Sequence, residues 1–185
     1  MSGSVQVIVL AGGSSRRFGS DKLVASLPDG RSVLDHCLLG MPSAWDLVVV
    51  GPSRPVPSEV AGRVRFVRES PAGGGPLAAI AAGLEVVTSQ VVCVVPGDAP
   101  RAGEVLPLLV STLEAEASAA AAVLSDGEGQ ANPVLAAYRV HELLGAVPRA
   151  AAGVAARTLL SLPHREVRAP FEVPDIDTPE DLGRL

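Results

Sequence analysis

The sequence predicts a single α/β layered domain with a mostly parallel sheet, and three observations support this prediction. Short β-branched apolar runs alternate along the chain with segments of helical character. Residues 91–95 (VVCVV) are apolar throughout, which is typical of a strand buried on both faces of a parallel sheet. The 185 residues contain no internal repeat and no long linker, so we expect one domain spanning residues 1–185.

Each element is predicted from its own local pattern. Strands are expected at short segments of four to six mainly apolar residues, and helices where longer mixed segments separate them. Residues 51–63, rich in Pro and Gly, are interpreted as a mobile rim or a long connection. In chain order we predict a strand at 5–10, a helix at 32–39, strands at 47–50 and 64–67, a helix at 77–87, a strand at 91–95, a helix at 104–117, strands at 119–124 and 134–138, a helix at 154–162 and a last helix from 178.

Composition and charge exclude several classes of protein. With 48% hydrophobic and 19% charged residues, the chain is too apolar for a disordered protein. No apolar run reaches the roughly 18 residues of a membrane span, and the first residues lack the basic segment of a signal peptide. A net charge of −5 without a basic tract argues against a nucleic-acid partner. The two cysteines form no disulfide framework, so a reducing cytoplasm is expected.

The loop after the first predicted strand has the residue types of a phosphate site. Residues 10–22 read LAGGSSRRFGSDK, with three glycines, two arginines and Lys22, the only lysine beside 14 arginines. Glycines allow backbone N–H groups to approach an anion, and the basic side chains add charge. The segment fits neither GxxxxGK[ST] nor GxGxxG. It predicts a phosphate loop of another kind, the alternative being an ordinary Gly/Ser loop with solvated charges.

Carboxylates near predicted strand ends are candidates for a metal site. Asp98 follows the strand at 91–95, at the end where such sheets bind ligands, so we expect it to hold Mg²⁺ together with substrate phosphates. The alternative is an N-cap of the next helix. In an extended segment Asp175 and Asp177 are expected to point to one side, where we predict that they hold the metal or its waters, or position a second substrate. Residues 178–181 (TPED) predict a helix start.

A further candidate follows the strand at 64–67. Glu69 precedes three glycines and Pro76, and a carboxylate can accept hydrogen bonds from N1–H and N2–H of guanine together. Adenine and cytosine do not offer that pair of donors. A solvated surface glutamate is the alternative.

These segments together resemble the MobA-like NTP transferase family, the nucleotidyltransferases that make molybdenum cofactor dinucleotides. Residues 10–22 are similar at every named position to its L-A-G-G-x-S-x-R-[MF]-G-x-D-K signature. Leu-Ala-Gly-Gly is more similar to the guanylyltransferase branch, and Leu-Ala-Ala-Gly to the cytidylyltransferase branch. Similar segments follow in the family's order at 75–80 (GPLAAI), 97–100 (GDAP) and 175–182 (DIDTPEDL).

The resemblance implies a three-layer α/β/α Rossmann-like nucleotidyltransferase fold with one late antiparallel strand. It implies transfer of GMP from GTP to the phosphate of molybdopterin, release of pyrophosphate, Mg²⁺ as cofactor, and contacts with molybdoenzyme maturation proteins. The expected catalytic residues are Lys22, Arg17 and Asp98, the expected metal ligands Asp98 and Asp177, and the expected acceptor-binding residues Arg157 and Asp175. The expected nucleotide site consists of Leu10, Ala11, Gly12, Gly13, Ser14, Lys22, Ser53, Glu69, Gly75, Pro76 and Asp98.

The sequence departs from the family at two places. The family often carries asparagines where Asp175 and Asp177 stand, and an asparagine after the second strand, where Ser53 is the nearest match. Two alternatives therefore stay open: a sister nucleotidyltransferase that uses CTP or another phosphorylated acceptor, and a nucleotide-binding regulatory protein without turnover. The presence of both Lys22 and Asp98 argues against the second.

Overall fold

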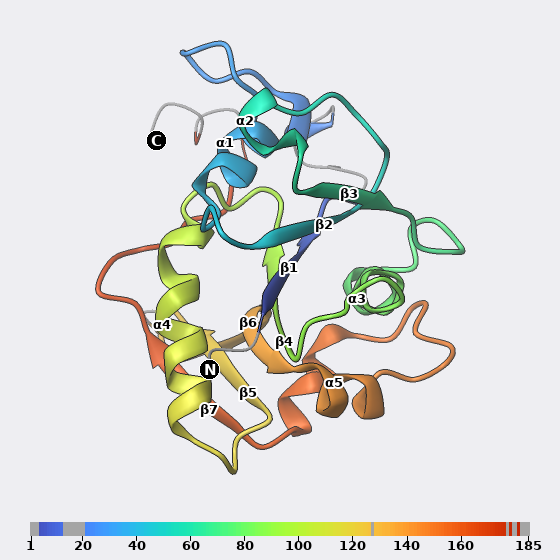
Figure 1. The fold of residues 1–185 in the computed structure, drawn as a ribbon, viewed down its shortest axis with the longest axis vertical. Coiled ribbons are helices and arrows are strands. Elements are labelled where there is room, and N and C mark those ends of the chain that lie inside the picture. The colour runs from blue at the N-terminus through green and yellow to red at the C-terminus, as the bar shows by residue number, and fades with distance from the viewer. Residues whose placement is uncertain (1–3, 13–20, 127, 177, 179–180, 182–185) are drawn as a thin grey trace.

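The computed structural model describes residues 4–12, 21–126, 128–176, 178 and 181. Within them the chain forms a seven-stranded sheet in the order β3-β2-β1-β4-β6-β5-β7 (Figure 1). Strand β6 runs antiparallel to both of its neighbours, and the other pairs are parallel, which confirms the predicted sheet. The strands are β1 (Val5–Leu10), β2 (Asp46–Val50), β3 (Val64–Val67), β4 (Val91–Pro96), β5 (Ala121–Ser125), β6 (Ala131–Arg139) and β7 (His164–Arg168).

Helices cover both faces of this sheet and complete three layers. One face is covered by η1 (Lys22–Val24), α1 (Val33–Gly40), α2 (Ser58–Ala61) and α4 (Ala102–Ala115). The other is covered by α3 (Pro76–Leu84), α5 (Val140–Ala146) and the 3-10 helix η2 (Ala156–Ser161). In the described parts of the chain, no helix is long and apolar enough to cross a membrane.

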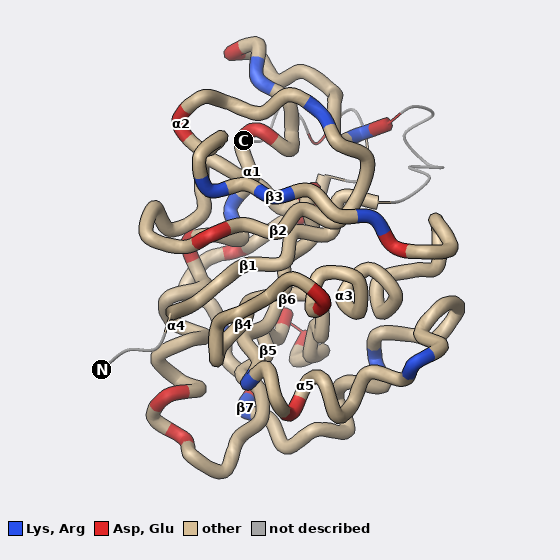
Figure 2. Tube along the Cα trace, turned by 45° about the vertical axis from the view of Figure 1, so that its right-hand side comes forward, with Lys and Arg blue, Asp and Glu red and all other residues tan. Residues whose placement is uncertain are grey.

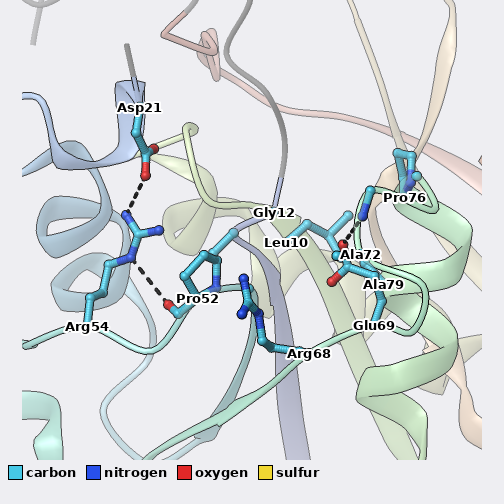
Figure 3. Close-up of a pocket in the computed structure, with 14 residues that line it drawn as sticks. Leu10, Gly12, Asp21, Pro52, Arg54, Arg68, Glu69, Ala72, Pro76 and Ala79 are labelled. Atoms are coloured by element: carbon cyan, nitrogen blue, oxygen red, sulfur yellow. Dashed lines mark hydrogen bonds and ion pairs between the residues drawn. The ribbon is translucent and has the colours of Figure 1, made fainter.

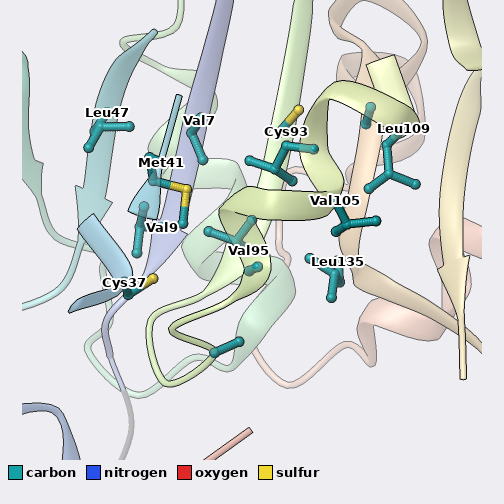
Figure 4. Close-up of a cluster of buried hydrophobic side chains, with 14 of the residues drawn as sticks. Val7, Val9, Cys37, Met41, Leu47, Cys93, Val95, Val105, Leu109 and Leu135 are labelled. Carbon is teal, nitrogen blue, oxygen red and sulfur yellow. The ribbon is translucent and has the colours of Figure 1, made fainter. Parts of the chain in front are cut away.

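The core consists of two apolar clusters, one on each face of the sheet. In β1, Val7 and Val9 pack towards α1 and α4, whereas Ile8 packs towards α3. In β4, Cys93 and Val95 belong to the first cluster, which Figure 4 shows. Burying each such side chain contributes about 1.5–3 kcal/mol to folding. This burial on both faces is why the central strands are apolar at consecutive positions, and it holds their ends in fixed places.

Side-chain hydrogen bonds stabilise the start of α1 and the C-terminal ends of α1 and α4. Ser32 begins α1 with a capping box, in which its hydroxyl accepts from Asp35 N at 3.0 Å and its N–H donates to the Asp35 carboxylate at 2.9 Å. Arg63 donates four hydrogen bonds to carbonyls at the C-terminal end of α1, those of Leu38, Met41, Pro42 and Trp45. Arg139 donates three to carbonyls at the C-terminal end of α4, those of Leu113, Glu116 and Ala119. These bonds supply donors to carbonyls in the last turn of each helix and in the segment that follows it.

Five elements differ from the prediction. The helix expected at 154–162 is the 3-10 helix η2, a form that proteins use in short connectors. The short helices η1, α2 and α5 and the strand β7 were not predicted. Most of the helix expected from residue 178 lies outside the described residues. In β7 only Val167 is buried, because charged side chains occupy most positions of this edge strand, so its apolar signal is weak.

Candidate functional site

The carboxyl ends of β1, β2, β3 and β4 lie side by side at one edge of the sheet. β1 pairs with β2 on one side and β4 on the other, so the order of the strands reverses there, at the point where such sheets bind ligands. Backbone hydrogen bonds continue past the strands, from Ala11 N to Val50 O at 2.8 Å and from Gly97 N to Leu10 O at 2.9 Å. A side chain at Gly51 would collide with the backbone of Ala11. The loops after these strands are therefore closely apposed.

Lys22 and Asp98 meet at this reversal point. The Lys22 ammonium, on the first residue of η1, forms an ion pair with the Asp98 carboxylate, which follows β4, and each side chain is 17% exposed. Asp98 does not cap α4, because the N-cap of that helix is Arg101. The helix-cap alternative for Asp98 is therefore wrong, and its carboxylate faces Lys22.

Asp21 holds the helical turn that carries Lys22. Its Oδ1 accepts a hydrogen bond from Leu23 N at 3.1 Å, which caps η1. Its Oδ2 lies 3.1 Å from Nη1 of Arg54, a residue of the loop after β2. Both oxygens of this carboxylate are thus engaged, one with its own turn and one with a neighbouring loop.

A cavity of about 640 Å³, called here the first cavity, opens beside these groups (Figure 3). It contains six of the residues expected at the nucleotide site. Ser53 is exposed, and its neighbours Pro52 and Arg54 line the cavity instead. The lining residues are Leu10, Ala11, Gly12, Asp21, Gly51, Pro52, Arg54, Arg68, Glu69, Ala72, Gly73, Gly75, Pro76 and Ala79.

Glu69 is fixed at the β3 side of the first cavity. Its Oε1 accepts a hydrogen bond from Gly73 N at 3.0 Å. A carboxylate has about four acceptor positions, so this bond leaves others for a ligand. A Cβ atom added to Gly12 would lie 3.2 Å from Oε1 of Glu69, closer than most Cβ contacts. Glycine at position 12 therefore leaves room for this carboxylate.

A second cavity of about 660 Å³ opens on the far side of β4 in the strand order. It lies at the ends of β5 and β7 and the beginning of β6, and it includes Asn132 and Asp175. The N–H of Ile176, next to Asp175, donates to the Asp98 carbonyl at 2.9 Å, so one wall of this cavity is attached to the end of β4. The lining residues are Leu124, Ser125, Asp126, Asn132, Leu135, Arg168, Ala169, Pro170, Phe171, Glu172, Val173, Pro174 and Asp175.

Arg101 supports the same wall from α4. Its guanidinium lies 4.8 Å from the centre of the Phe171 ring, within the range of a cation–π contact. Glu104 orients that guanidinium by accepting from its Nε at 2.8 Å and from its Nη2 at 3.0 Å. The segment after β7 is thereby packed against the start of α4.

Charges lie at the ends of the central strands and not within them. Figure 2 shows β1 and β4 without charged residues, whereas Lys22 and Asp98 follow them. Burial raises the pKa of the Cys37 thiol, and the carboxylates of Asp98 and Asp175 raise it further. The carboxylates of Asp98 and Asp175 therefore both act on the buried Cys37 thiol. Among the described residues, no group of three His, Cys, Asp or Glu side chains is close enough to hold a metal ion.

Among the described residues of the expected site, Lys22, Ser53 and Asp98 line neither cavity themselves. Gly13, Ser14, Arg17 and Asp177 lie outside the described residues. Arg157, on η2, is exposed and lines neither cavity.

Sequence reasoning missed three arginines. Arg54 and Arg68 line the first cavity, and Arg168 lines the second. Each stands at or shortly after the end of a strand, which is the signal that could have identified them.

The chain is similar to a known protein family and to named relatives. The profile of a family described as "MobA-like NTP transferase domain" matches residues 7–171. A Bacillus cereus protein named "Probable molybdenum cofactor guanylyltransferase" is 35% identical over 147 residues, which cover 76% of this chain and 72% of that protein. A Bacillus anthracis protein of the same name is 34% identical over the same shares of the two chains.

Solved structures agree with these relatives. The crystal structure of "Molybdopterin-guanine dinucleotide biosynthesis protein A" from Archaeoglobus fulgidus is similar, with a TM-score of 0.69 and 25% identity, and the match covers 97% of this chain and 95% of that one. A nucleotidyl transferase from Methanothermobacter has the same fold, with a TM-score of 0.73 at 19% identity over 98% and 95% of the two chains. The chain therefore belongs to the MobA-like NTP transferase family and is a nucleotidyltransferase.

Proposed function

We propose that the protein transfers GMP from GTP to the terminal phosphate of molybdopterin, with release of pyrophosphate. The observation that carries this proposal is the Glu69 carboxylate, which lies in the first cavity beside Gly12. The names of the curated relatives, which are called molybdenum cofactor guanylyltransferases, support the same reaction. The product would be molybdopterin guanine dinucleotide.

Recognition of the base would depend on Glu69. Guanine presents two adjacent donors, N1–H and N2–H, and a carboxylate can accept from both. The bond from Gly73 N holds this carboxylate in place before a ligand arrives. Cytosine would leave acceptor positions of a partly buried carboxylate unsatisfied, which costs binding energy.

Binding of the triphosphate would depend on the loop after β1. Lys22 supplies a compact positive charge at the reversal point, and the backbone N–H groups of Gly12, Gly13 and Ser14 would bind phosphate oxygens, with Arg17 as a second cation. The ion pair between Lys22 and Asp98 would open when phosphate oxygens take the place of the carboxylate at the ammonium.

The chemical step needs positioning more than proton transfer. An oxygen of the acceptor phosphate attacks the α-phosphorus of GTP, and the bond from that phosphorus to the bridging oxygen of the β-phosphate breaks. The attacking oxygen is already anionic, so no side chain has to remove a proton from it. The residues at the reversal point hold the two reacting groups together and offset their negative charge.

The Asp98 carboxylate fits a bound Mg²⁺ ion. Mg²⁺ prefers one or two carboxylates together with substrate phosphates, and Asp98 offers oxygen ligands at a strand end next to the proposed triphosphate site. Asp177 would be its second carboxylate. The bound ion supplies charge neutralisation on the α-phosphate and on the leaving pyrophosphate.

The acceptor would bind in the second cavity. β4 separates the two cavities in the strand order, so two substrates bound in them would meet over Asp98. Asp175 lies on the wall that is attached to Asp98, and Arg168 supplies a positive charge for an anionic acceptor. The proposal gives Arg157 no contact with either substrate, because this exposed side chain lines neither cavity.

The test measures pyrophosphate release with GTP, CTP and ATP, each with and without molybdopterin. We expect release with GTP and molybdopterin together, and a preference for GTP over CTP of about 10³-fold or more. Glu69→Gln is the matched variant, because it keeps the shape of the side chain but replaces one acceptor oxygen by a donor. It should lose most of the preference for GTP.

Two outcomes would contradict the proposal. Equal turnover of GTP and CTP would indicate a sister enzyme with another nucleotide. Nucleotide binding without pyrophosphate release, with any phosphorylated acceptor supplied, would indicate a regulatory protein.

A further inference from the structure

We propose that Arg54 is a positioning residue of this nucleotidyltransferase: through Asp21 it fixes the place of the Lys22 ammonium. The inference rests on the proposed binding of a nucleoside triphosphate in the first cavity, and it concerns a residue that the sequence motifs do not include.

Arg54 is held between its own loop and the loop after β1. Its Nε donates to the Pro52 carbonyl at 3.4 Å, and its Nη1 faces the Asp21 carboxylate at 3.1 Å (Figure 3). The side chain is only 13% exposed although it lies in a Pro- and Gly-rich connection. Nη1 is buried and makes no hydrogen bond within the described residues, so its charge is balanced by the ion pair with Asp21.

Asp21 transmits this contact to Lys22. Its two oxygens engage Arg54 on one side and the N–H of Leu23 on the other, and Lys22 is the residue between Asp21 and Leu23. A shift of the Asp21 carboxylate therefore moves the turn that carries the ammonium. Arg54 itself is attached to the end of β2, whose position is set by the buried core.

Charges of opposite sign also face each other between the segments that follow three strands. Arg54, after β2, faces Asp21, which follows β1. Lys22, next to Asp21, faces Asp98, which follows β4. Asp21 lines the first cavity, where a triphosphate would be repelled by an unbalanced carboxylate. Arg54 balances that charge, and its planar guanidinium contacts the Pro52 carbonyl through Nε and Asp21 through Nη1.

The experiment compares Arg54→Gln, Asp21→Asn and the double variant. Asn caps a helical turn as well as Asp does, so Asp21→Asn removes only the charge that faces Arg54. The measurement is the equilibrium affinity for GTP and for GMP by calorimetry, with a thermal melt of each protein. Arg31→Gln is the control, because the Arg31 guanidinium pairs with Glu59 at 3.0 Å on the exposed surface.

We expect Arg54→Gln to bind GTP roughly tenfold more weakly while its affinity for GMP stays within about twofold, since Lys22 serves the triphosphate. Asp21→Asn should lose less, because it also removes the carboxylate that would repel the triphosphate. The double variant should be no weaker than the weaker single variant. Arg54→Lys should recover part of the loss, and Arg31→Gln should equal the wild type.

Two results would overturn the role of Arg54 alone: GTP affinity of Arg54→Gln equal to that of the control, or losses that multiply in the double variant, which would mean direct contact with the nucleotide. If the wild type binds neither GTP nor CTP nor ATP, the proposed function fails, and the role of Arg54 fails with it.

Discussion

The arginines at the two edges of the sheet differ in what their guanidinium groups contact. At the edge where β3 begins and β6 ends, Arg63 and Arg139 donate to backbone carbonyls, four bonds from the first and three from the second. At the opposite edge, Arg54 faces a carboxylate, and Arg68 and Arg168 line cavities.

This difference indicates that the arginines at the first edge contribute to stability and those at the opposite edge to ligand binding. An arginine whose donors are bound to the ends of helices has few left for a ligand, and its loss leaves carbonyls without partners. An arginine beside a cavity can be exchanged with little effect on folding, but its charge acts on whatever binds there. The comparison therefore predicts that variants at one edge lower stability and variants at the other lower activity.

The largest effect is expected for Asp98→Asn at the ligand edge. Asn keeps the shape of the side chain but lacks the charge that a metal ion requires, so turnover should fall on the order of 10²-fold or more, about 2.7 kcal/mol. A titration of turnover with Mg²⁺ should shift to higher concentrations, while the melting temperature stays within about 2 °C. An unchanged titration curve would remove Asp98 from the site.

A smaller loss is expected for Lys22→Ala. Removing a charge-assisted contact to the triphosphate should weaken GTP binding by about 2 kcal/mol, roughly 30-fold. Calorimetry with GTP measures this loss directly. Lys22→Arg should also bind poorly, because a broad planar fork does not replace a compact ammonium. Turnover of the alanine variant within about twofold of the wild type would show that Lys22 does not contact the triphosphate.

The smallest of the three effects belongs to the other edge. Arg139→Met keeps much of the apolar stem but removes the side-chain donor from the carbonyls of Leu113 and Ala119. We therefore expect a loss of about 1.5 kcal/mol of unfolding free energy. This corresponds to a decrease of about 3–6 °C in melting temperature. The affinity for GTP should not change. A weaker affinity at unchanged stability would contradict the division between the two edges.

Much of the fold could be predicted because its signals are local. β2 and β4 contain consecutive apolar residues at 47–50 and 91–95. β1 and β3 are mainly apolar, and the strand expected at 64–67 has the observed bounds. The strand β7 could not be predicted in the same way, since its pairing with β5 supplies the hydrogen bonds that its own sequence does not indicate. The helix expected at 154–162 was wrong in type, because only Ala156 and Leu159 of that turn are buried.

The residues of the candidate site could be predicted where they belong to a contiguous sequence motif. They could not be predicted where they are joined only by contacts between distant segments. Gly12, Lys22 and Asp98 follow strand ends in recognisable segments, and the structure brings Lys22 and Asp98 together. The pairing of Arg54 with Asp21 joins residues 33 positions apart in segments without a shared pattern. Such a pair follows from the strand order, which the sequence does not state.

The reversed direction of β6 has a consequence for how this enzyme can diverge. Because β6 starts at the edge where β5 ends, the two are joined by a short hairpin, closed by Asp126 N donating to Gln130 O at 3.0 Å. Asp126 also fixes the turn by accepting from the N–H groups of Glu128 and Gln130. This hairpin borders the second cavity and is separated from the first by β4. With the acceptor in the second cavity, as proposed above, insertions or exchanges in this hairpin are expected to change the choice of acceptor during evolution without changing the first cavity.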